Sequence, residues 1–451
     1  MGGTRIAYHL GMIFRRYGTF TGGIDLPDDK RPTLDKPIAV WGPIERLRVP
    51  LAPCGGTPAE SVVEVARHVQ AGERIARSAG GGVDIFAPLS GRVAALSWAQ
   101  VAAGACLAAC PAIELSDLSQ MEGIAPVEER EDPREESPQA LRDRIAEGSL
   151  MTCHPRPAAL AQWVAKAHSK RCRVLIANVM ENQPMVTANH RLLVEYGGEV
   201  VRGLAILGRA IEVGELILAV DERRTGDYRR LVQPTRRHHV KRIALSHKYP
   251  TGAEAILAKI LTRREVPPGR SLLEIGVGVV DAATCLAVYR WVAAGIRQTA
   301  RVVTVAGRVE RPGNYYVPFG TDCMAMTGGA DVPIIHGGPM VGLRCGDQGV
   351  VGPATDAVLA VETCRFAAPG PCIRCGWCTD HCPARLNVAA LNDDFELNLV
   401  ERAHQAGALA CVECGVCSYV CPARLPLSQR IKQLKQAIGL LRKRMPLFAS
   451  G

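Results

Sequence analysis

Aromatic residues are scarce in this 451-residue chain, and so are long uninterrupted apolar runs. Phe, Trp and Tyr make up only 5% of the sequence, which leaves few platforms for stacked bases, so we expect no nucleic-acid partner despite a net charge of +10. The basic excess suits a membrane surface or an acidic electron-transfer partner instead. The most apolar stretches, 201–220 and 272–294, are both interrupted by charged residues, so the sequence predicts no transmembrane segment.

The sequence also predicts no export signal, because no charged start is followed by a long apolar run. We therefore expect a cytoplasmic protein that is soluble or peripheral on the inner face of the cell membrane. Nine of the 17 cysteines are scattered without regular spacing and are expected to be small buried hydrophobes in a reducing compartment.

The other eight cysteines form two runs near the C-terminus, each with the spacing C-x2-C-x2-C-x3-C-P. The first run is Cys372, Cys375, Cys378 and Cys382, and the second run is Cys411, Cys414, Cys417 and Cys421. This is the ferredoxin-type ligand pattern, in which three closely spaced thiolates bind one 4Fe-4S cluster and the fourth binds the other. It favours iron–sulfur clusters over tetrahedral zinc, which uses C-x2-C pairs, and over disulfides, which suit small secreted domains.

The spacing thus predicts two clusters with crossed ligands. The first set consists of Cys372, Cys375, Cys378 and Cys421; the second set consists of Cys411, Cys414, Cys417 and Cys382. We expect Pro383 and Pro422 to shape the turns of the fourth ligands. Four apolar neighbours are expected to keep water away from the sulfur atoms and so tune the reduction potentials: Ile373, Trp377, Val412 and Val416.

Composition and periodicity divide the rest of the chain. Short alternating runs at 62–65, 72–75 and 85–93 predict strands within an N-terminal unit of residues 1–115, whose pattern APxSGxV looks like the flattened barrel of lipoyl and biotinyl carriers. The tip at 78–84 has no lysine for a prosthetic arm, so we interpret this unit as structural. An acidic, proline-rich linker is expected at 116–140, including Glu128, Glu129, Glu131, Asp132, Glu135 and Glu136.

Three further units precede the C-terminal helix. Short apolar runs at 173–177, 216–220 and 242–246 predict strands, and they alternate along the chain with predicted helices at 190–207, at a segment ending near 261 and at 282–294. This alternation predicts an α/β domain over 141–298. A small β-rich module is expected at 299–358 and the cluster domain at 359–426. The tail, 427–451, reads as a basic amphipathic helix whose apolar face packs on the chain itself, with membrane or partner binding as the alternative.

Together these parts resemble the RnfC family, the C subunits of the Rnf electron-transport complex, and the cobalamin reductase of bacterial microcompartments shares several of them. The likeness rests on APxSGxV, on VVTVAGRVERPGNY and GGPMVG in residues 302–342, and on the two cysteine runs. It implies a multidomain α/β and α+β fold made of four parts: a barrel-sandwich hybrid, an α/β domain like the flavoprotein of respiratory complex I, an SLBB (soluble-ligand-binding β-grasp) module, and an α-helical domain with two clusters.

The resemblance also exposes departures in the flavin site. The family loop G-x-G-G-A-G-F-P-T is replaced by residues 147–155, which keep one glycine and introduce Leu150 and Met151 where a phosphate would approach the backbone. Other family positions survive, and Asn178, Glu181 and Lys248 are implied contacts for FMN or NADH. The scaffold is thus retained without its glycine cradle.

Several functions stay open at this stage. The leading hypothesis is single-electron relay through two 4Fe-4S clusters to a ferredoxin, a flavoprotein or Rnf-type membrane subunits, with or without a working NADH and FMN site. The alternatives are a cobalamin reductase in a microcompartment, which would use NADH, FMN and clusters, and a scaffold subunit with structural clusters. Whether the chain is itself an NADH-linked oxidoreductase is left open.

Overall fold

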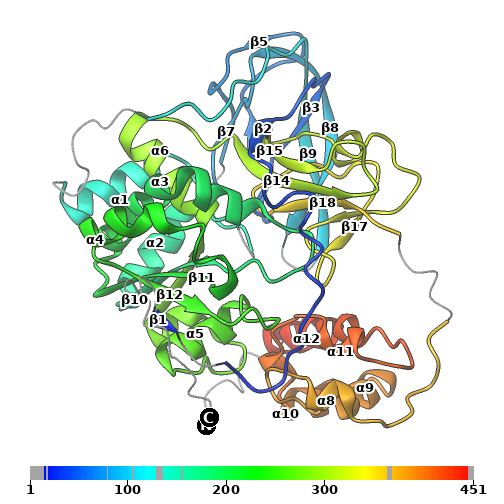
Figure 1. Ribbon diagram of the computed structural model, residues 1–451. Helices are drawn as coiled ribbons and strands as arrows, with labels where there is room; N and C mark the ends of the chain where they lie inside the picture. Colours follow the sequence, from blue (N-terminus) through cyan, green and yellow to red (C-terminus); the bar gives the residue numbers. More distant parts are fainter. Residues whose placement is uncertain are drawn as a thin grey trace, which may run out of the picture.

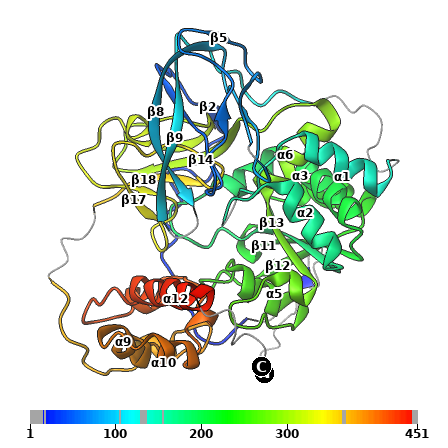
Figure 2. The same cartoon turned by 180° about the vertical axis from the view of Figure 1, so that it is seen from behind.

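The computed structural model describes residues 15–16, 19–78, 80–103, 106–127, 136–153, 156–362 and 368–444. Two β-rich modules lie together at the top of the view, a layered α/β domain lies beside them, and a small helical domain lies below (Figure 1). The same arrangement is seen from behind (Figure 2). Most of the acidic residues predicted for the linker fall outside the described residues, as do His154, Pro155 and the tail beyond Arg444.

The N-terminal module is a flattened barrel of two small antiparallel sheets. One sheet has the strand order β3-β9-β8-β5 and the other β4-β6-β7. Its strands are β3 (Leu47–Pro50), β4 (Glu60–Ser61), β5 (His68–Val69), β6 (Arg74–Arg77), β7 (Ile85–Phe86), β8 (Gly91–Ala103) and β9 (Cys106–Ser116). Ile75, Ile85 and Val93 point into its core, as their alternation with polar residues predicts.

Two features of this module differ from the prediction. The strand β4 ends at Ser61, so the run 62–65 is not a strand, and its Val62 and Val65 are 44% and 56% exposed. The hairpin β8–β9 extends ten residues past Val93 and exposes Trp98. Sequence reasoning missed this extension because its alternation is carried by alanine and serine, whose hydrophobic contrast is small.

The α/β domain is built on a parallel five-stranded sheet of order β1-β12-β11-β10-β13. The strands are β1 (Arg15–Arg16), β10 (Val174–Val179), β11 (Glu215–Asp221), β12 (Val240–Leu245) and β13 (Val277–Asp281). The helices are α1 (Pro138–Glu147), α2 (Leu160–Ser169), α3 (Ala188–Ile211), α4 (Val232–Arg237), α5 (Glu254–Thr262) and α6 (Ala282–Ala294), with short 3₁₀ turns at Glu222–Arg224, Arg229–Leu231 and Leu272–Ile275. These elements confirm the alternating layout predicted for this part of the chain.

The second β-rich module is a mixed six-stranded sheet of order β17-β16-β18-β14-β15-β2. It contains β2 (Ile38–Val40), β14 (Ala300–Gly307), β15 (Gly313–Pro318), β16 (Ile334–His336), β17 (Leu343–Cys345) and β18 (Ala357–Ala360), with the short helix α7 (Cys323–Met326). The predicted hairpin of β14 and β15 is present and antiparallel. The glycine-rich segment 337–342 forms the turn between β16 and β17.

Residues 19–40 tie these parts together. The segment pairs with the α/β domain through Ile24 and Tyr249, and β2 then adds an edge strand beside β15. Gly23 N–H also donates a 2.8 Å hydrogen bond to the carbonyl of His381 in the helical domain. The N-terminal lead-in is therefore a strap across three domains.

The helical domain contains the two cysteine runs. Its helices are α8 (Trp377–Asp380), α9 (Val388–Glu396), α10 (Val400–Gln405), α11 (Val416–Tyr419) and α12 (Leu427–Arg444), with a 3₁₀ turn at Ala408–Ala410. Ile431, Leu434 and Ile438 on α12 are buried against Leu391 and Ala403 of the same domain. This packing confirms that the apolar face of the tail helix covers the chain itself. Across the described residues, no helix has the length and apolar character needed to cross a membrane.

Candidate iron–sulfur centres and the flavoprotein-like site

The two cysteine runs fold as a structural repeat. In each run the residue before the second cysteine has a positive φ, 57° at Arg374 and 58° at Glu413. The glycine after that cysteine is also left-handed, with φ of 81° at Gly376 and 78° at Gly415, and it begins the short helix that carries the third cysteine. The repeated sequence C-x-x-C-G-x-C thus winds the backbone around three thiols in the same way twice.

The first set of thiols surrounds one cavity. Cys372, Cys375 and Cys378 line it together with Cys421, which comes from the other run. Burial raises the pKa of the Cys378 thiol, and the neighbouring Cys421 and Cys372 add to the shift. Among the described residues, no group of three His, Cys, Asp or Glu side chains is arranged to hold a single metal ion.

The second set is also drawn from both runs. Burial raises the pKa of Cys411 to about 11 and that of Cys414 to about 12, with Cys382 close enough to contribute to both shifts. The pKa of Cys417 is likewise raised by burial and then by Cys411, Cys414 and Cys382. Metal binding at such protonated thiols must displace protons.

The donor chemistry around the second set fits a thiolate-bound cluster. The backbone N–H of Glu413 lies 3.4 Å from Cys411 Sγ, and the N–H of Leu386 lies 3.4 Å from Cys382 Sγ. Such hydrogen bonds stabilise negative charge on sulfur and raise the reduction potential of a cluster. Apolar packing from Leu386 and Leu425 completes the surroundings.

The two sets differ sharply in their exposure. Ile373 and Trp377, beside the first set, are 64% and 54% exposed, so the prediction that they shield its sulfur atoms is wrong. Val416, beside the second set, is fully buried and confirms the prediction, while Val412 is half-buried. The difference arises because, within the described residues, side chains of the neighbouring domains pack around the second set.

Tyr249 and the turn between β16 and β17 make that cover. Tyr249 Oη donates a 2.6 Å hydrogen bond to the carbonyl of Cys414, and its ring packs with Leu26 and Val416. Gly415 lies so close to the turn that an added Cβ would be 2.4 Å from the carbonyl oxygen of Met340. The second set is therefore held against both the α/β domain and the six-stranded sheet.

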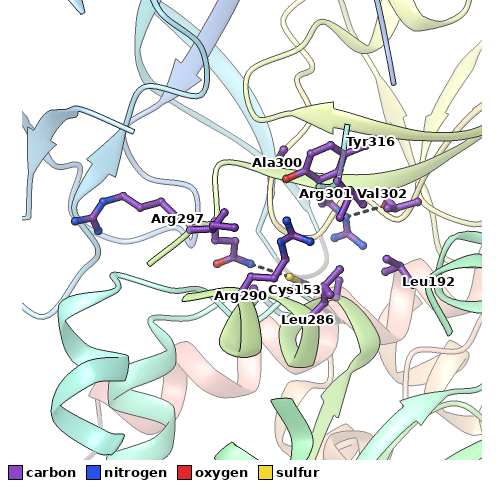
Figure 3. A pocket seen from close by; sticks show the side chains of 14 residues that line it. Cys153, Leu192, Leu286, Arg290, Arg297, Ala300, Arg301, Val302 and Tyr316 are labelled. Atoms are coloured by element: carbon purple, nitrogen blue, oxygen red, sulfur yellow. Dashed lines mark hydrogen bonds between the residues drawn. The ribbon is translucent and has the colours of Figure 1, made fainter. Parts of the chain in front are cut away.

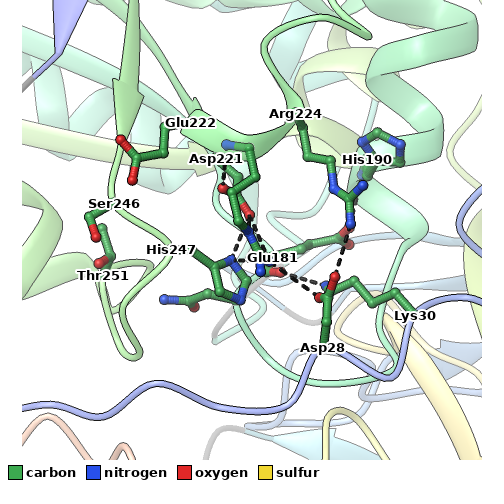
Figure 4. Close-up of polar contacts among 12 residues, drawn as sticks. Asp28, Lys30, Glu181, His190, Asp221, Glu222, Arg224, Ser246, His247 and Thr251 are labelled. Carbon is green, nitrogen blue, oxygen red and sulfur yellow. Dashed lines mark hydrogen bonds and ion pairs between the residues drawn. The ribbon is translucent and has the colours of Figure 1, made fainter. Parts of the chain in front are cut away.

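The carboxyl ends of β10, β11 and β12 carry a polar network where a parallel sheet commonly binds ligands (Figure 4). Asp221 contacts His247 at 2.6 Å and Arg223 at 3.3 Å. Burial works to raise the pKa of Asp221, but hydrogen bonds from His247 and the Arg223 backbone outweigh it and hold this pKa at about 2. Sequence reasoning missed this network, although Asp221 directly follows a predicted strand.

The strap supplies the rest of the network. Asp28 forms ion pairs with Arg223 at 3.3 Å and with Arg224 at 2.9 Å. The buried Lys30 ammonium donates to the backbone carbonyls of Glu181 and Val186, and burial lowers its pKa. This edge of the sheet is thus occupied by the chain's own side chains.

The three residues implied as nucleotide contacts all have partners within the protein. Asn178 donates to the carbonyl of Gly252 at 2.9 Å. The Glu181 carboxylate accepts the backbone N–H groups of Asn189 and His190 at the start of α3, and burial raises its pKa. Lys248 donates to the carbonyl of Phe20 in the strap at 3.2 Å. Asn178 thus holds the loop at Gly252, Glu181 caps the start of α3, and Lys248 contacts the strap.

The loop that replaces the glycine cradle is filled with side chains. Leu150, Met151 and Cys153 are 1%, 5% and 1% exposed, and they pack into the hydrophobic cores on either side. The surviving Gly148 faces the ring of Trp291, where an added Cβ would lie 2.7 Å away. The residues present do not fit FMN, because the backbone that would contact its phosphate is covered.

A second cavity lies between this loop, α6 and the six-stranded sheet, and no sequence pattern predicted it (Figure 3). Gln298 bridges the backbone of Met151 and the thiol of Cys153 on one side of it. Arg290 and Arg301 also line the cavity, and both are at least nine-tenths buried. The cavity marks the joint between two domains.

Comparison with known proteins matches three parts of the chain to family models. Residues 18–116 match the RnfC barrel sandwich hybrid domain, residues 157–290 the Nuo51 FMN-binding domain, and residues 371–426 a 4Fe-4S dicluster domain. The fold of the FMN-binding domain is thus retained around a loop that does not fit the flavin.

Curated relatives match most of the chain. It is 31% identical over 389 residues to the C subunit of the ion-translocating oxidoreductase complex of Edwardsiella ictaluri, covering 82% of this chain and 48% of the relative. It is 29% identical over 405 residues to the C subunit of the proton-translocating ferredoxin:NAD(+) oxidoreductase complex of Clostridium ljungdahlii, covering 86% of both. The chain spans about half the length of several relatives it matches, including the one from Edwardsiella.

Among solved structures, an NAD+-reducing [NiFe]-hydrogenase in its air-oxidised state is similar with a TM-score of 0.49 and 17% identity, over 69% of this chain and 68% of that chain. The order of the three matched domains, the two cysteine runs and the relatives along most of the sequence lead to one conclusion: the chain is similar over most of its length to the C subunits of ion-translocating oxidoreductase complexes and contains the RnfC barrel sandwich hybrid domain.

Proposed function

We propose that this chain relays single electrons through two 4Fe-4S clusters as the C subunit of an Rnf-type complex. One observation carries the proposal: the two thiol sets each draw their fourth member from the opposite run within one small domain. Cys372, Cys375, Cys378 and Cys421 would hold the first cluster, and Cys411, Cys414, Cys417 and Cys382 the second. A bound 4Fe-4S cluster supplies one-electron chemistry.

The chain's own residues position the two centres differently. Tyr249, Leu26 and Met340 exclude water from the second set, while Cys375 of the first set is exposed. Backbone N–H groups of Glu413 and Leu386 donate toward sulfur atoms of the second set, and Thr379 donates to Cys378 of the first set. Burial disfavours the more negative reduced cluster, so the unequal burial of the two sets should give the two clusters different potentials.

The α/β domain serves in this proposal as a scaffold that does not bind flavin. Leu150, Met151 and Cys153 fill the former cradle, and Lys30 and Asp28 occupy the carboxyl edge of the sheet. Asn178, Glu181 and Lys248, the sequence candidates for FMN or NADH, would then have structural roles. Electrons would arrive from an outside ferredoxin or flavoprotein, and Rnf-type membrane subunits would hold the chain peripherally at the membrane.

Strands β14 to β18 of the six-stranded sheet are assigned to an SLBB-like β-grasp module, predicted at residues 299–358. Its antiparallel pair β14–β15 and the glycine-rich turn at 337–342 support the assignment. In this proposal the module works as a spacer, because its turn packs against Gly415 beside the second cluster.

Anaerobic quantitation of iron, sulfide and flavin on one sample tests the proposal. We expect two clusters in each chain and no stoichiometric FMN. Cys421→Ser should abolish the first cluster and spare the second, although Cys421 lies in the second run. Electron paramagnetic resonance of the reduced protein would show which signal disappears. Zinc in place of iron would overturn the assignment of two clusters. Bound FMN with NADH-dependent bleaching of the clusters would overturn the role of the α/β domain as a scaffold.

A further inference from the structure

Large apolar side chains gather on the surface beside the first thiol set. Ile373 is 64% exposed, Trp377 is 54% exposed and Tyr419 is 58% exposed. Ile373 lines the cavity of the first set, and Trp377 begins α8, which packs against the helix that ends at Tyr419. We call these three residues the apolar patch. In both views the domain bearing them lies below the β-rich modules and beside the α5 end of the α/β domain (Figures 1 and 2).

The internal repeat shows that this exposure is specific to one run. Ile373 and Trp377 occupy the positions that Val412 and Val416 occupy in the second run. There the aliphatic residues are covered by Leu26, Tyr249 and Met340 of the chain itself. At the equivalent surface of the first run, the same backbone carries larger side chains that nothing in the described chain covers. Exposed apolar groups concentrated at one point commonly mark a contact surface.

The charge of this domain indicates the kind of partner. Residues 368–444 contain ten Lys and Arg against six Asp and Glu. Arg424, three residues after Cys421, is exposed and forms no ion pair with the described residues. Arg374 is 67% exposed, and solvent weakens its ion pair with Asp393. A positive surface of this kind steers negatively charged partners toward it.

We propose that the apolar patch, with Arg374 and Arg424 at its rim, is the docking surface for an acidic single-electron carrier protein. This inference rests on the proposed relay function and specifies where electrons cross the surface. The first cluster exchanges electrons with the carrier, and the second cluster, enclosed by the other domains, exchanges with the first. Trp377 supplies the apolar contact at the centre and Arg424 the long-range attraction.

Flavodoxin hydroquinone is a suitable probe, because it is acidic and its oxidation product has a distinct blue colour. Each transfer moves one electron from the anionic hydroquinone to an oxidised cluster. The hydroquinone already carries a proton on N5 and keeps it, so the product is the neutral semiquinone and no proton passes between the proteins. Anaerobic stopped-flow mixing with the full-length protein gives the second-order rate constant. We expect Trp377→Ser to lower it about tenfold, whereas Trp98→Ser, at a tryptophan 57% exposed on the distant barrel, should leave it unchanged.

The salt dependence of the rate constant and a charge reversal at Arg424 provide a second test of the docking surface. The wild-type rate constant should fall at least about tenfold between roughly 10 mM and 300 mM salt, and Arg424→Glu should remove most of that dependence. Arg230→Glu, at an exposed arginine of the α/β domain, is the matched control. Titanium(III) citrate, a small reductant that needs no docking surface, should reduce the clusters of every variant at the wild-type rate.

The possible results separate this inference from the relay function. If Trp377→Ser and Arg424→Glu react with flavodoxin as fast as their controls, the docking surface is refuted although the clusters still transfer electrons. If titanium(III) citrate reduces neither cluster in the wild type, the relay itself is refuted and the inference fails with it. A selective loss in the two patch variants, with unchanged reduction by titanium(III) citrate, supports the docking surface.

Discussion

Replacing Gly415 by alanine should loosen the cluster domain from the six-stranded sheet, and the repeat provides a matched control in Gly376. Both glycines have a positive φ, 78° and 81°, and both follow the second cysteine of their run. An added Cβ at Gly415 would lie 2.4 Å from the carbonyl oxygen of Met340, whereas the nearest atom at Gly376 is a carboxylate oxygen of Asp380 at 3.9 Å. The two substitutions thus share the backbone strain and differ in the clash.

The shared strain should cost about 1–2 kcal/mol in each variant, since alanine is disfavoured in the left-handed region. The clash at Gly415 involves backbone, which cannot rotate away, so the domains must separate locally. Overpacking of this kind costs about 1–3 kcal/mol. We therefore expect the free energy of opening the contact between residue 415 and the turn 337–342 to be about 1–3 kcal/mol lower in Gly415→Ala than in Gly376→Ala.

Hydrogen exchange measures this local opening directly, because amide protection reports the free energy of each opening reaction. Peptides covering 334–345 should exchange roughly 5- to 150-fold faster in Gly415→Ala than in wild type. In Gly376→Ala they should stay within about twofold, since that glycine does not touch the sheet. Equal exchange of these peptides in the two variants would show that the Met340 carbonyl does not fix the second run, and the reasoning would fail.

Three further predictions concern the strap, a buried histidine and a helix contact. Lys30→Met should leave the carbonyls of Glu181 and Val186 without their donor and destabilise the strap by about 1–3 kcal/mol, detectable as faster proteolysis at 19–36. Burial lowers the pKa of His336 from 6.5 to about 4, so the unfolded chain binds a proton that the folded chain does not. The free energy of unfolding should therefore fall as the pH drops from about 6.5 to about 4. In His336→Gln this fall, measured by urea titration, should be smaller by about 3 kcal/mol. Gly203→Ala places a Cβ 1.8 Å from the carbonyl oxygen of Cys285, so it should push α3 away from α6 and lower the free energy of unfolding by about 1–3 kcal/mol. Gly198→Ala on the same helix is the control and should leave the melting temperature unchanged or raise it.

Local patterns predicted most of the secondary structure. The strand at β10, the helix α6 and the terminal helix α12 lie where periodicity placed them, because buried faces impose a period of two or 3.6 on apolar residues. The long β8–β9 hairpin was missed for want of contrast between alanine and serine, and the exposed run at 62–65 was misread as a strand. Both errors concern residues whose environment depends on neighbours far along the chain.

At the candidate flavin site, too, the sequence did not reveal contacts between residues far apart along the chain. The sequence indicated that the glycine cradle was lost, because Leu150 and Met151 replace glycines. It could not indicate that Asp28 and Lys30 would lie over the carboxyl edge of the sheet, since they are about 150 to 200 residues away from Glu181 and Arg224. Residue spacing carries no information on such distant partners.

By itself, the sequence determined the ligand chemistry, because thiolates separated by two intervening residues can bind one cubane cluster together through local backbone geometry. It also determined that one domain would contain both runs. Only the tertiary structure decided that the second set is enclosed while Ile373 and Trp377 beside the first are exposed. The physical reason is that the two runs have nearly the same local fold, so their difference arises entirely from which domains pack against them.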